Sequence, residues 1–348
     1  MSGSLYQNET AQSFEYFSQP KVAGLIYDWM CLGIRGADPS FCVGKNGEYY
    51  LILQTPDGGD VNSGITSIRF WSGATVVELF ANLRNPPKYL YTEDSGIPAY
   101  LTWAPEIFFH RATSEYQLLV SACANNNNAD HRILHGVAPA MEGPYTFRLP
   151  IDVKANEDED RWAIDCTMVE IPDPISGNAT QKYAIWSGWP QKDSGFPQNI
   201  YAARVNADGS FGPRRLIAEP LYDWCKTDLG SLLEGPQALH INGEFFGFLV
   251  ASNASWNNNY CTGILWYLGG DPLDKSSWYL DPEPLLPPGI GIGHGMLIPD
   301  DDPETVSFLA HAILIEGGGW LEREIVLLKL FKAEILRRRE LALAACKN

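Results

Sequence analysis

The stretch GEYYLILQT at residues 47–55 decides the fold, because stretches of the same kind return four more times along the chain. Each one is a turn residue followed by an aromatic-rich, alternating strand that ends in small or polar residues. The other copies are SEYQLLVSA (114–122), QKYAIWSGW (181–189), GEFFGFLVAS (243–252) and TVSFLAHA (305–312). Such a recurrence indicates one supersecondary unit repeated along the chain.

The spacing of these copies predicts the architecture. The anchoring aromatic residues lie 67, 67, 62 and 63 residues apart and are Tyr49, Tyr116, Tyr183, Phe245 and Phe308. A unit of this length holds four short strands with their turns, which is one blade of a β-propeller. We therefore predict an all-β protein whose single domain, residues 22–331, is a five-bladed β-propeller. A pair of β-sandwiches would explain the strands but not their even spacing.

The two ends of the chain fall outside this repeat. Residues 1–21 form an N-terminal lead, and residues 332–348 form a C-terminal tail or helix. A further turn of helix is expected at ELFANL (78–83). No segment resembles a signal peptide, which favours a cytoplasmic location. The sequons at Asn8, Asn178 and Asn253 point the other way, to a secreted protein whose signal was removed.

The composition of the chain argues against several classes of binding partner. The formal net charge of −17 would repel phosphate backbones, so we expect no nucleic-acid partner. No apolar run approaches the ~20 residues that span a bilayer, so we expect no membrane association. The seven cysteines contain no C-x-x-C pair and do not indicate a zinc site, a redox motif or a disulfide framework. We also expect a monomer.

A short segment with one polar residue precedes each repeated strand. The five segments are GADPSF with Asp38, WAPEIFF with Glu106, WAIDCTMVE with Asp165, LLEGPQAL with Glu234, and IGHGMLI with His294. The first strand of a propeller blade lines the central channel, so we expect these residues to converge on one axis. Charged groups there would be costly unless they are paired, solvated or functional. The pattern therefore favours a functional site.

These segments, in this order, resemble glycoside hydrolase family 43. The matching motifs are DPS, WAPE, ID, EGP and GHG, and the resemblance runs from about residue 22 to about residue 330. That family folds as a five-bladed propeller, which agrees with the repeats. The resemblance implies that Asp38 is the general base, Glu234 the general acid, and Asp165 the residue that tunes and orients the acid.

This chemistry suits carboxylates. In inverting hydrolysis one carboxylate activates water and a second, protonated, one donates to the leaving oxygen, with roughly 6.5–9.5 Å between them. An ionised Asp165 near Glu234 would raise the pKa of the acid by like-charge repulsion. Taken singly, Asp38 reads as a turn starter, Glu234 as a turn cap and Asp165 as part of a buried strand.

The resemblance also implies substrate and metal contacts, each with a structural alternative. Glu106 either supports the base region or is a satisfied structural carboxyl. His294 either holds a calcium ion or water at the propeller centre or is a hydrogen-bonded structural histidine. Arg323 contacts substrate or is an exposed strand residue. Trp103, Trp189 and Trp71 stack on the sugar or belong to the core. No cofactor is expected to be required, although the propeller centre could hold a structural calcium.

The substrate is expected to be a plant cell-wall polysaccharide or oligosaccharide. The chain ends soon after the last match, without the β-sandwich that larger β-xylosidases append, and IWSGWPQKDSGFPQNIYAAR (185–204) is similar to exo-acting arabinofuranosidases. We therefore expect an α-L-arabinofuranosidase acting on arabinan or arabinoxylan. A β-xylosidase, an endo-arabinanase, a fructoside-hydrolysing propeller and a catalytically silent carbohydrate-binding propeller remain alternatives.

Overall fold

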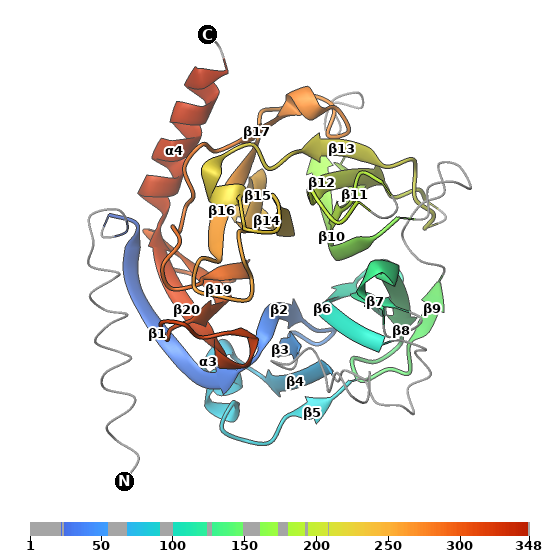
Figure 1. Ribbon diagram of the computed structural model, residues 1–348. Coiled ribbons are helices and arrows are strands. Elements are labelled where there is room, and N and C mark those ends of the chain that lie inside the picture. The colour runs from blue at the N-terminus through green and yellow to red at the C-terminus, as the bar shows by residue number, and fades with distance from the viewer. Residues whose placement is uncertain are drawn as a thin grey trace.

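A computed structural model describes residues 22, 24–54, 68–90, 100–123, 127–148, 161–172, 180–191, 194–207 and 209–346. In it, five antiparallel sheets of four strands each stand around a central axis, which is a five-bladed β-propeller (Figure 1). The predicted fold is therefore confirmed. The lead at residues 1–21 and the sequons at Asn8 and Asn178 lie outside the described residues.

Four blades are continuous in sequence. Blade one contains β2 (Ala37–Val43), β3 (Tyr49–Gln54), β4 (Ile68–Gly73) and β5 (Lys88–Tyr89). Blade two contains β6 (Tyr100–His110), β7 (Glu115–Cys123), β8 (Arg132–Ala138) and β9 (Thr146–Arg148). Blade three contains β10 (Ala163–Pro172), β11 (Thr180–Gly188), β12 (Asn199–Arg204) and β13 (Arg215–Ala218). Blade four contains β14 (Leu233–Ile241), β15 (Glu244–Ser252), β16 (Cys261–Tyr267) and β17 (Trp278–Leu280).

The fifth blade joins the two ends of the chain. Its first three strands are β18 (Gly293–Ile298), β19 (Thr305–Ile313) and β20 (Arg323–Phe331), and its outer strand is the N-terminal β1 (Ile26–Arg35). β1 pairs antiparallel with β20, so blue and red ribbons run side by side in Figure 1. This pairing closes the ring with hydrogen bonds, because the last repeat supplies only three strands of its own.

The repeated stretch found in the sequence is the second strand of every blade: β3, β7, β11, β15 and β19. Its residues are buried almost throughout; in β19 every residue is buried. The first strands of neighbouring blades contact one another in a closed ring around the axis. Each blade therefore buries its middle strands between neighbours and presents its first strand to the channel.

Every first strand carries the same irregularity near its start. The pairing with the second strand slips by one residue there, which is a β-bulge. The first bulged residue has a positive φ of 45–57° in all five blades and is Asp38, Ala104, Asp165, Gly235 or His294. Proline follows it in blades one, two and four, where the bulge interrupts the ladder and a residue without a backbone N–H is tolerated.

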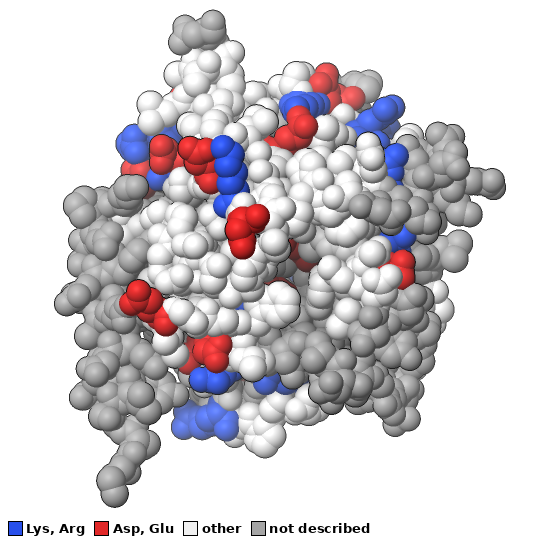
Figure 2. Space-filling view, in the orientation of Figure 1, with Lys and Arg blue, Asp and Glu red and all other residues white. Residues whose placement is uncertain are grey.

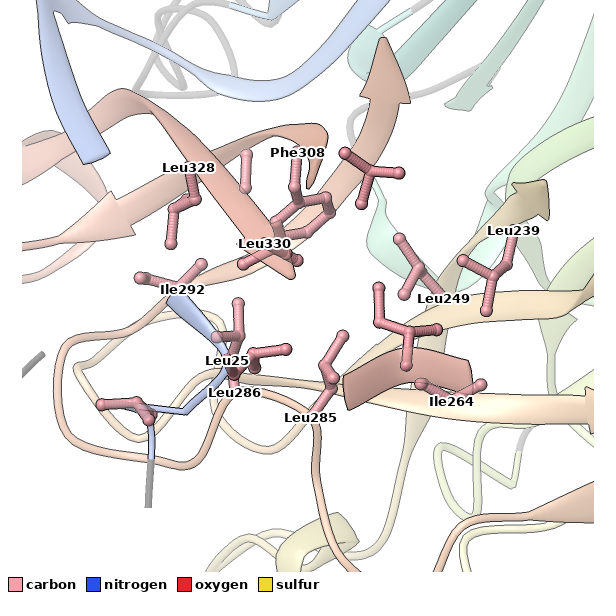
Figure 3. Packing of buried hydrophobic residues seen from close by; sticks show 14 of the residues in the cluster. Leu25, Leu239, Leu249, Ile264, Leu285, Leu286, Ile292, Phe308, Leu328 and Leu330 are labelled. Carbon is pink, nitrogen blue, oxygen red and sulfur yellow. The ribbon is translucent and has the colours of Figure 1, made fainter. Parts of the chain in front are cut away.

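Two helices lie among the described residues. α3 (Val76–Asn82) begins at Thr75, whose hydroxyl accepts the Glu78 N–H, and α4 (Lys332–Ala345) follows β20 directly. Both were expected from the sequence. α4 buries Ile335 against the interface of blades four and five, where Leu249, Phe308 and Leu328 pack together (Figure 3). No helix in the described part of the chain is long and apolar enough to cross a membrane.

Candidate active site

Asp38, Asp165 and Glu234, the three predicted catalytic carboxylates, meet at the bulged end of the first strands. Asp38 lies on β2, Asp165 on β10 and Glu234 on β14, and the charge of Asp38 raises the pKa of both other carboxyls. All three side chains are nearly buried. Figure 2 shows this face of the disc, with acidic atoms at the bottom of a central hollow.

The five polar residues predicted to share one position do not share it. Asp38, Asp165 and His294 occupy the left-handed position of the bulge, whereas Glu234 precedes that position by one residue and Glu106 follows it by two. The prediction of a common phase was therefore wrong for the two glutamates. A bulge adds one residue to the strand, and a shift of one residue changes the direction of a side chain.

Asp38 is held ionised by its neighbours. Nδ1 of His294 lies 3.2 Å from Asp38 Oδ1, and Nδ1 of His311 lies 3.3 Å from the same oxygen. Burial alone would raise the pKa of Asp38, but His294, His311 and Arg323 outweigh it and hold the pKa well below its usual range. Asp38 is therefore a carboxylate over the whole physiological pH range, as a general base requires.

Burial opposes protonation of the two histidines beside Asp38. Burial lowers the pKa of His294, and it lowers that of His311 to about 4 despite the nearby Asp38 charge. Nδ1 of His311 lies 3.2 Å from the backbone N of Asp38 and 3.3 Å from its Oδ1, so this ring nitrogen contacts both the backbone and the carboxylate of Asp38. Nδ1 of His294 faces the carboxylate and is the atom that can donate to Asp38 Oδ1.

Asp165 and Glu234 form a coupled, buried pair. Burial raises the pKa of Asp165 far above its ordinary value, and the charges of Glu234 and Asp38 add to this. Burial also raises the pKa of Glu234, and the charge of Asp38 adds to it, against the opposing effects of Tyr260 and Arg323. Such a pair titrates as a unit, so it retains a proton well above the pH at which a free carboxyl loses it.

Two hydrogen bonds orient this pair. The backbone N–H of Gly235 donates to Asp165 Oδ2 at 3.0 Å, and the hydroxyl of Tyr260 donates to Glu234 Oε1 at 2.8 Å. Glycine at position 235 avoids a clash, since a Cβ there would lie 2.8 Å from the His294 ring. Asp165 therefore holds the backbone next to the acid, while Tyr260 holds the acid itself.

Glu106 lies deeper in the channel. Its Oε1 accepts from the Thr167 hydroxyl at 2.9 Å, and its Oε2 accepts from Gln237 Nε2 at 2.7 Å. Glu106, Thr167 and Gln237 hold the same position in their bulged strands, so they tie three blades together. Burial raises the pKa of Glu106 to about 7, although both hydrogen bonds oppose the shift.

A small cavity of about 10 Å³ lies between these layers, with room for roughly one water molecule. Its lining comprises Asp38, Pro39, Ser40, Ala104, Pro105, Glu106, Asp165, Cys166, Gln237 and His294. The cavity is too small for a sugar, so we expect substrate to approach through the hollow in the face shown in Figure 2.

Few side-chain ligands for the predicted calcium ion lie near His294 in the described part of the chain. Nδ1 of His294 is directed at Asp38, with Asp165 Oδ2 at 3.7 Å. Across the described ranges, no group of three or more His, Cys, Asp or Glu side chains could hold a metal ion. Calcium prefers several oxygen ligands, so an ion beside His294 would take most of its ligands from water. The calcium site stays a prediction, and no step below depends on it.

Among the other predicted substrate contacts, Arg323 acts electrostatically on the catalytic carboxylates. It is buried at the start of β20, its Nε donates to the Trp320 carbonyl, and its charge lowers the pKa of Asp38 and Glu234. It is not the exposed strand residue of the alternative interpretation. Trp103 is half-buried and stacks on His131, with ring centroids 3.8 Å apart.

Two tryptophans are less available to a ligand. Trp189 is buried and stacks on Trp162, with centroids 4.6 Å apart. Trp71 is buried in the apolar cluster between blades one and five, and its Nε1 donates to the Asn85 carbonyl. Trp71 is therefore a core residue, as its structural alternative proposed.

Sequence reasoning missed Tyr260 and His311, which contact the acid and the base. It also missed a set of side chains in the preceding blade that accept a hydrogen bond from the backbone N–H of the bulged residue. Gln54 accepts from Ala104 and Ser121 accepts from Asp165, both at 2.9 Å. His311 does the same for Asp38. A signal was present, because these residues are the polar ends of the repeated stretches. Tyr260 follows NNN at the start of a strand and carries no comparable signal.

A propeller whose channel mouth combines an ionised carboxylate with a protonated carboxyl pair is equipped for glycoside hydrolysis. The sequence matches the model of glycosyl hydrolases family 43 over residues 31–331, and the chain belongs to that family. It is therefore a glycoside hydrolase.

Solved structures of the same fold cover nearly the whole chain. An α-L-arabinofuranosidase from Lactobacillus brevis has 22% identity and a TM-score of 0.69 over 88% of this chain and 93% of its own. An endo-arabinase from Bacteroides thetaiotaomicron VPI-5482 has 18% identity and a TM-score of 0.59, over 86% and 96%. A xylan β-1,4-xylosidase from Bacillus halodurans C-125 has 16% identity and a TM-score of 0.56, over 85% and 52%. No curated protein matches the sequence significantly.

Proposed function

We propose that the protein is an inverting α-L-arabinofuranosidase that removes terminal arabinofuranosyl units from arabinan- or arabinoxylan-type polysaccharides or oligosaccharides. The observation that carries the proposal is the contrast between Asp38, whose pKa is held low, and the Asp165–Glu234 pair, whose pKa values are raised. Groups whose environments push their pKa values apart are suited to act as base and acid.

In the proposed reaction Asp38 is the general base. It takes a proton from a water molecule while the water oxygen attacks the anomeric carbon of the arabinofuranosyl unit. His294 donates to Oδ1 of Asp38, so Oδ2 remains to accept the proton. The bond between the anomeric carbon and the glycosidic oxygen breaks, and Glu234 protonates that oxygen as it leaves. The base ends protonated and the acid ionised, and the new hydroxyl lies on the opposite face of the sugar.

Asp165 is proposed to tune and orient the acid. Its carboxyl accepts the N–H of Gly235, the residue after Glu234. Since the two carboxyls are coupled, ionising one raises the pKa of the other, which keeps the acid protonated near neutral pH. Arg323 is proposed to contact the substrate, because its charge already reaches both Asp38 and Glu234.

The arabinofuranosyl specificity is supported by the similarity to the Lactobacillus brevis enzyme, whose chain this one covers almost fully. The purified protein is incubated with 4-nitrophenyl α-L-arabinofuranoside, 4-nitrophenyl β-D-xyloside and debranched arabinan. Release from the arabinofuranoside alone supports the proposal. Activity only on the xyloside identifies a β-xylosidase, and activity only on debranched arabinan identifies an endo-arabinanase.

Two controls complete the test. Glu234→Gln keeps the shape of the acid but removes its proton, and Glu304→Gln makes the same side-chain substitution at an exposed position away from the site. Loss of hydrolysis of the polysaccharide or oligosaccharide in the first variant, and its retention in the second, is the expected result. If the wild-type protein binds oligosaccharide but releases no sugar from any substrate, it is a carbohydrate-binding propeller. The first product seen by NMR should be the β-anomer; an α-anomer would refute inversion.

A further inference from the structure

Tyr260 is a buried residue that contacts the proposed general acid, Glu234. It lies in the turn before β16 and is only 1% exposed, and its hydroxyl donates to Glu234 Oε1 at 2.8 Å. Burial, followed by the charges of Glu234, Asp38 and Asp165, raises the pKa of Tyr260 well above its usual range. The hydroxyl therefore keeps its proton and remains a donor at any working pH.

The ring of Tyr260 is as tightly placed as its hydroxyl. It stacks on His311 with centroids 5.3 Å apart and planes within 7°. On another side it approaches Gly293, where a Cβ would lie 2.4 Å from the ring. His311 in turn accepts the N–H of Asp38. One packed pair of rings thus links the acid of blade four with the base of blade one.

We propose that Tyr260 is a positioning residue for the general acid: by donating to Oε1, it places the transferable proton of Glu234 on Oε2 and stabilises the carboxylate that remains after proton transfer. The proposal rests on the acid role of Glu234 given above.

The hydrogen-bond arithmetic supports this assignment. A protonated carboxyl has one O–H and one carbonyl oxygen, and the oxygen that already accepts a hydroxyl is the carbonyl oxygen. When Glu234 gives its Oε2 proton to the glycosidic oxygen, negative charge develops on the carboxylate. A hydrogen bond to a charged group is stronger than one to a neutral group, so Tyr260 contributes most as the proton leaves.

The groups that face Glu234 come from several elements. Asp165 of β10 and Asp38 of β2 are acidic, Arg323 of β20 is basic, and Tyr260 is the direct donor. Removing the hydroxyl leaves the first three in place. The pKa of the acid is therefore expected to rise, since a stabilising side-chain donor is lost while both acidic neighbours remain.

The test is Tyr260→Phe, measured on an aryl glycoside and on an oligosaccharide of the sugar that the wild type hydrolyses. Aryl leaving groups need little protonation, whereas sugar alcohols need it fully. We expect kcat on the oligosaccharide to fall about 10- to 100-fold, the value of a hydrogen bond to a charged group, with a much smaller loss on the aryl glycoside. The alkaline limb of the kcat/KM profile should move to higher pH, because ionised Glu234 loses a donor.

Two further variants make the result decisive. Gly293→Ala keeps the hydroxyl but displaces the ring, and it should show the same dependence on the leaving group even if the first variant folds poorly. Tyr145→Phe removes a buried tyrosine hydroxyl that donates to the Met141 carbonyl in blade two, and it should match the wild type on both substrates.

Equal losses on both substrates in Tyr260→Phe and Gly293→Ala, or an unmoved alkaline limb, would overturn the inference while leaving the proposed function intact. A wild-type protein that hydrolyses no glycoside would overturn the proposed function, and the inference with it.

Discussion

Replacing Glu106 by glutamine should make the folded protein more stable at alkaline pH. The carboxyl of Glu106 is buried, and its pKa is raised from 4.5 to about 7. The folded state therefore holds a proton that the unfolded chain has already lost. The stability contributed by such a carboxyl is fully present when the pH is below 4.5, the pKa of the group in the unfolded chain. It is lost as the pH rises toward 7, the pKa in the folded protein. Each pKa unit corresponds to about 1.4 kcal/mol, so the loss amounts to about 3 kcal/mol.

The amide of Glu106→Gln avoids this loss without breaking the clamp. Its oxygen can accept from Thr167, and its nitrogen can donate to Gln237 once the amide of Gln237 has rotated. The variant should match the wild type near pH 4.5 and exceed it by about 3 kcal/mol at pH 8. Shifts from Asp165 and Glu234 affect both proteins alike and cancel in the difference.

The measurement is urea unfolding followed by tryptophan fluorescence, at pH 4.5 and pH 8, for wild type and variant. Glu304→Gln removes a charge from an exposed carboxylate and serves as the matched control, with no expected change in pH dependence. A Glu106→Gln variant with the same stability difference at both pH values would refute a raised pKa for this group. A variant less stable only at pH 8 would show that the ionised clamp stabilises the fold.

Three further changes probe the bulges and the base. Asp38→Asn should reduce kcat about 10²- to 10⁴-fold, the usual contribution of a general base, with thermal stability retained. Ser121→Ala should lower the free energy of unfolding by about 1–3 kcal/mol, because the buried N–H of Asp165 loses its acceptor. Gly235→Ala should be inactive, since the added Cβ lies 2.8 Å from His294 and the left-handed backbone adds about 1–2 kcal/mol of strain.

Each of these has an outcome that would count against it. Full activity in Asp38→Asn would remove this residue from the base role. Unchanged urea midpoints in Ser121→Ala would mean that the hydrogen bond from blade two does not hold the third bulge. For Gly235→Ala, wild-type kcat with an intact fold would show that the His294 ring yields at no cost, and the crowded geometry would then have no bearing on catalysis.

Much of the fold followed from the sequence because the repeat is strong. The spacing of the anchoring aromatics, from Tyr49 to Phe308, predicted five blades, and the repeated stretches are the second strands. The second strand is buried on both faces by its neighbours, so its apolar pattern is the clearest of the four. The pairing of β1 with β20 was not predicted, since a strand that closes the ring has no local signature in either segment.

The residues of the candidate site were predicted only in part from the sequence. Asp38, Asp165 and Glu234 stood out because carboxylates are rare in apolar strands, and the structure brings them together. Their phase did not follow from the sequence, because the bulge is a property of φ and of pairing, and Glu234 lies one residue before the left-handed position that Asp38 occupies. Tyr260 was missed because nothing in its neighbours along the chain marks it.

The sequence by itself determined the number of blades, the order of the channel segments and the residue types that reach the axis, since these depend on periodicity and composition alone. Only the tertiary structure decided which atoms meet. Asp38 is low in pKa because two histidines of the fifth blade face it, and Glu234 is oriented by a tyrosine 26 residues away. Contacts between blades depend on how the ring closes, and no local stretch of chain encodes that geometry.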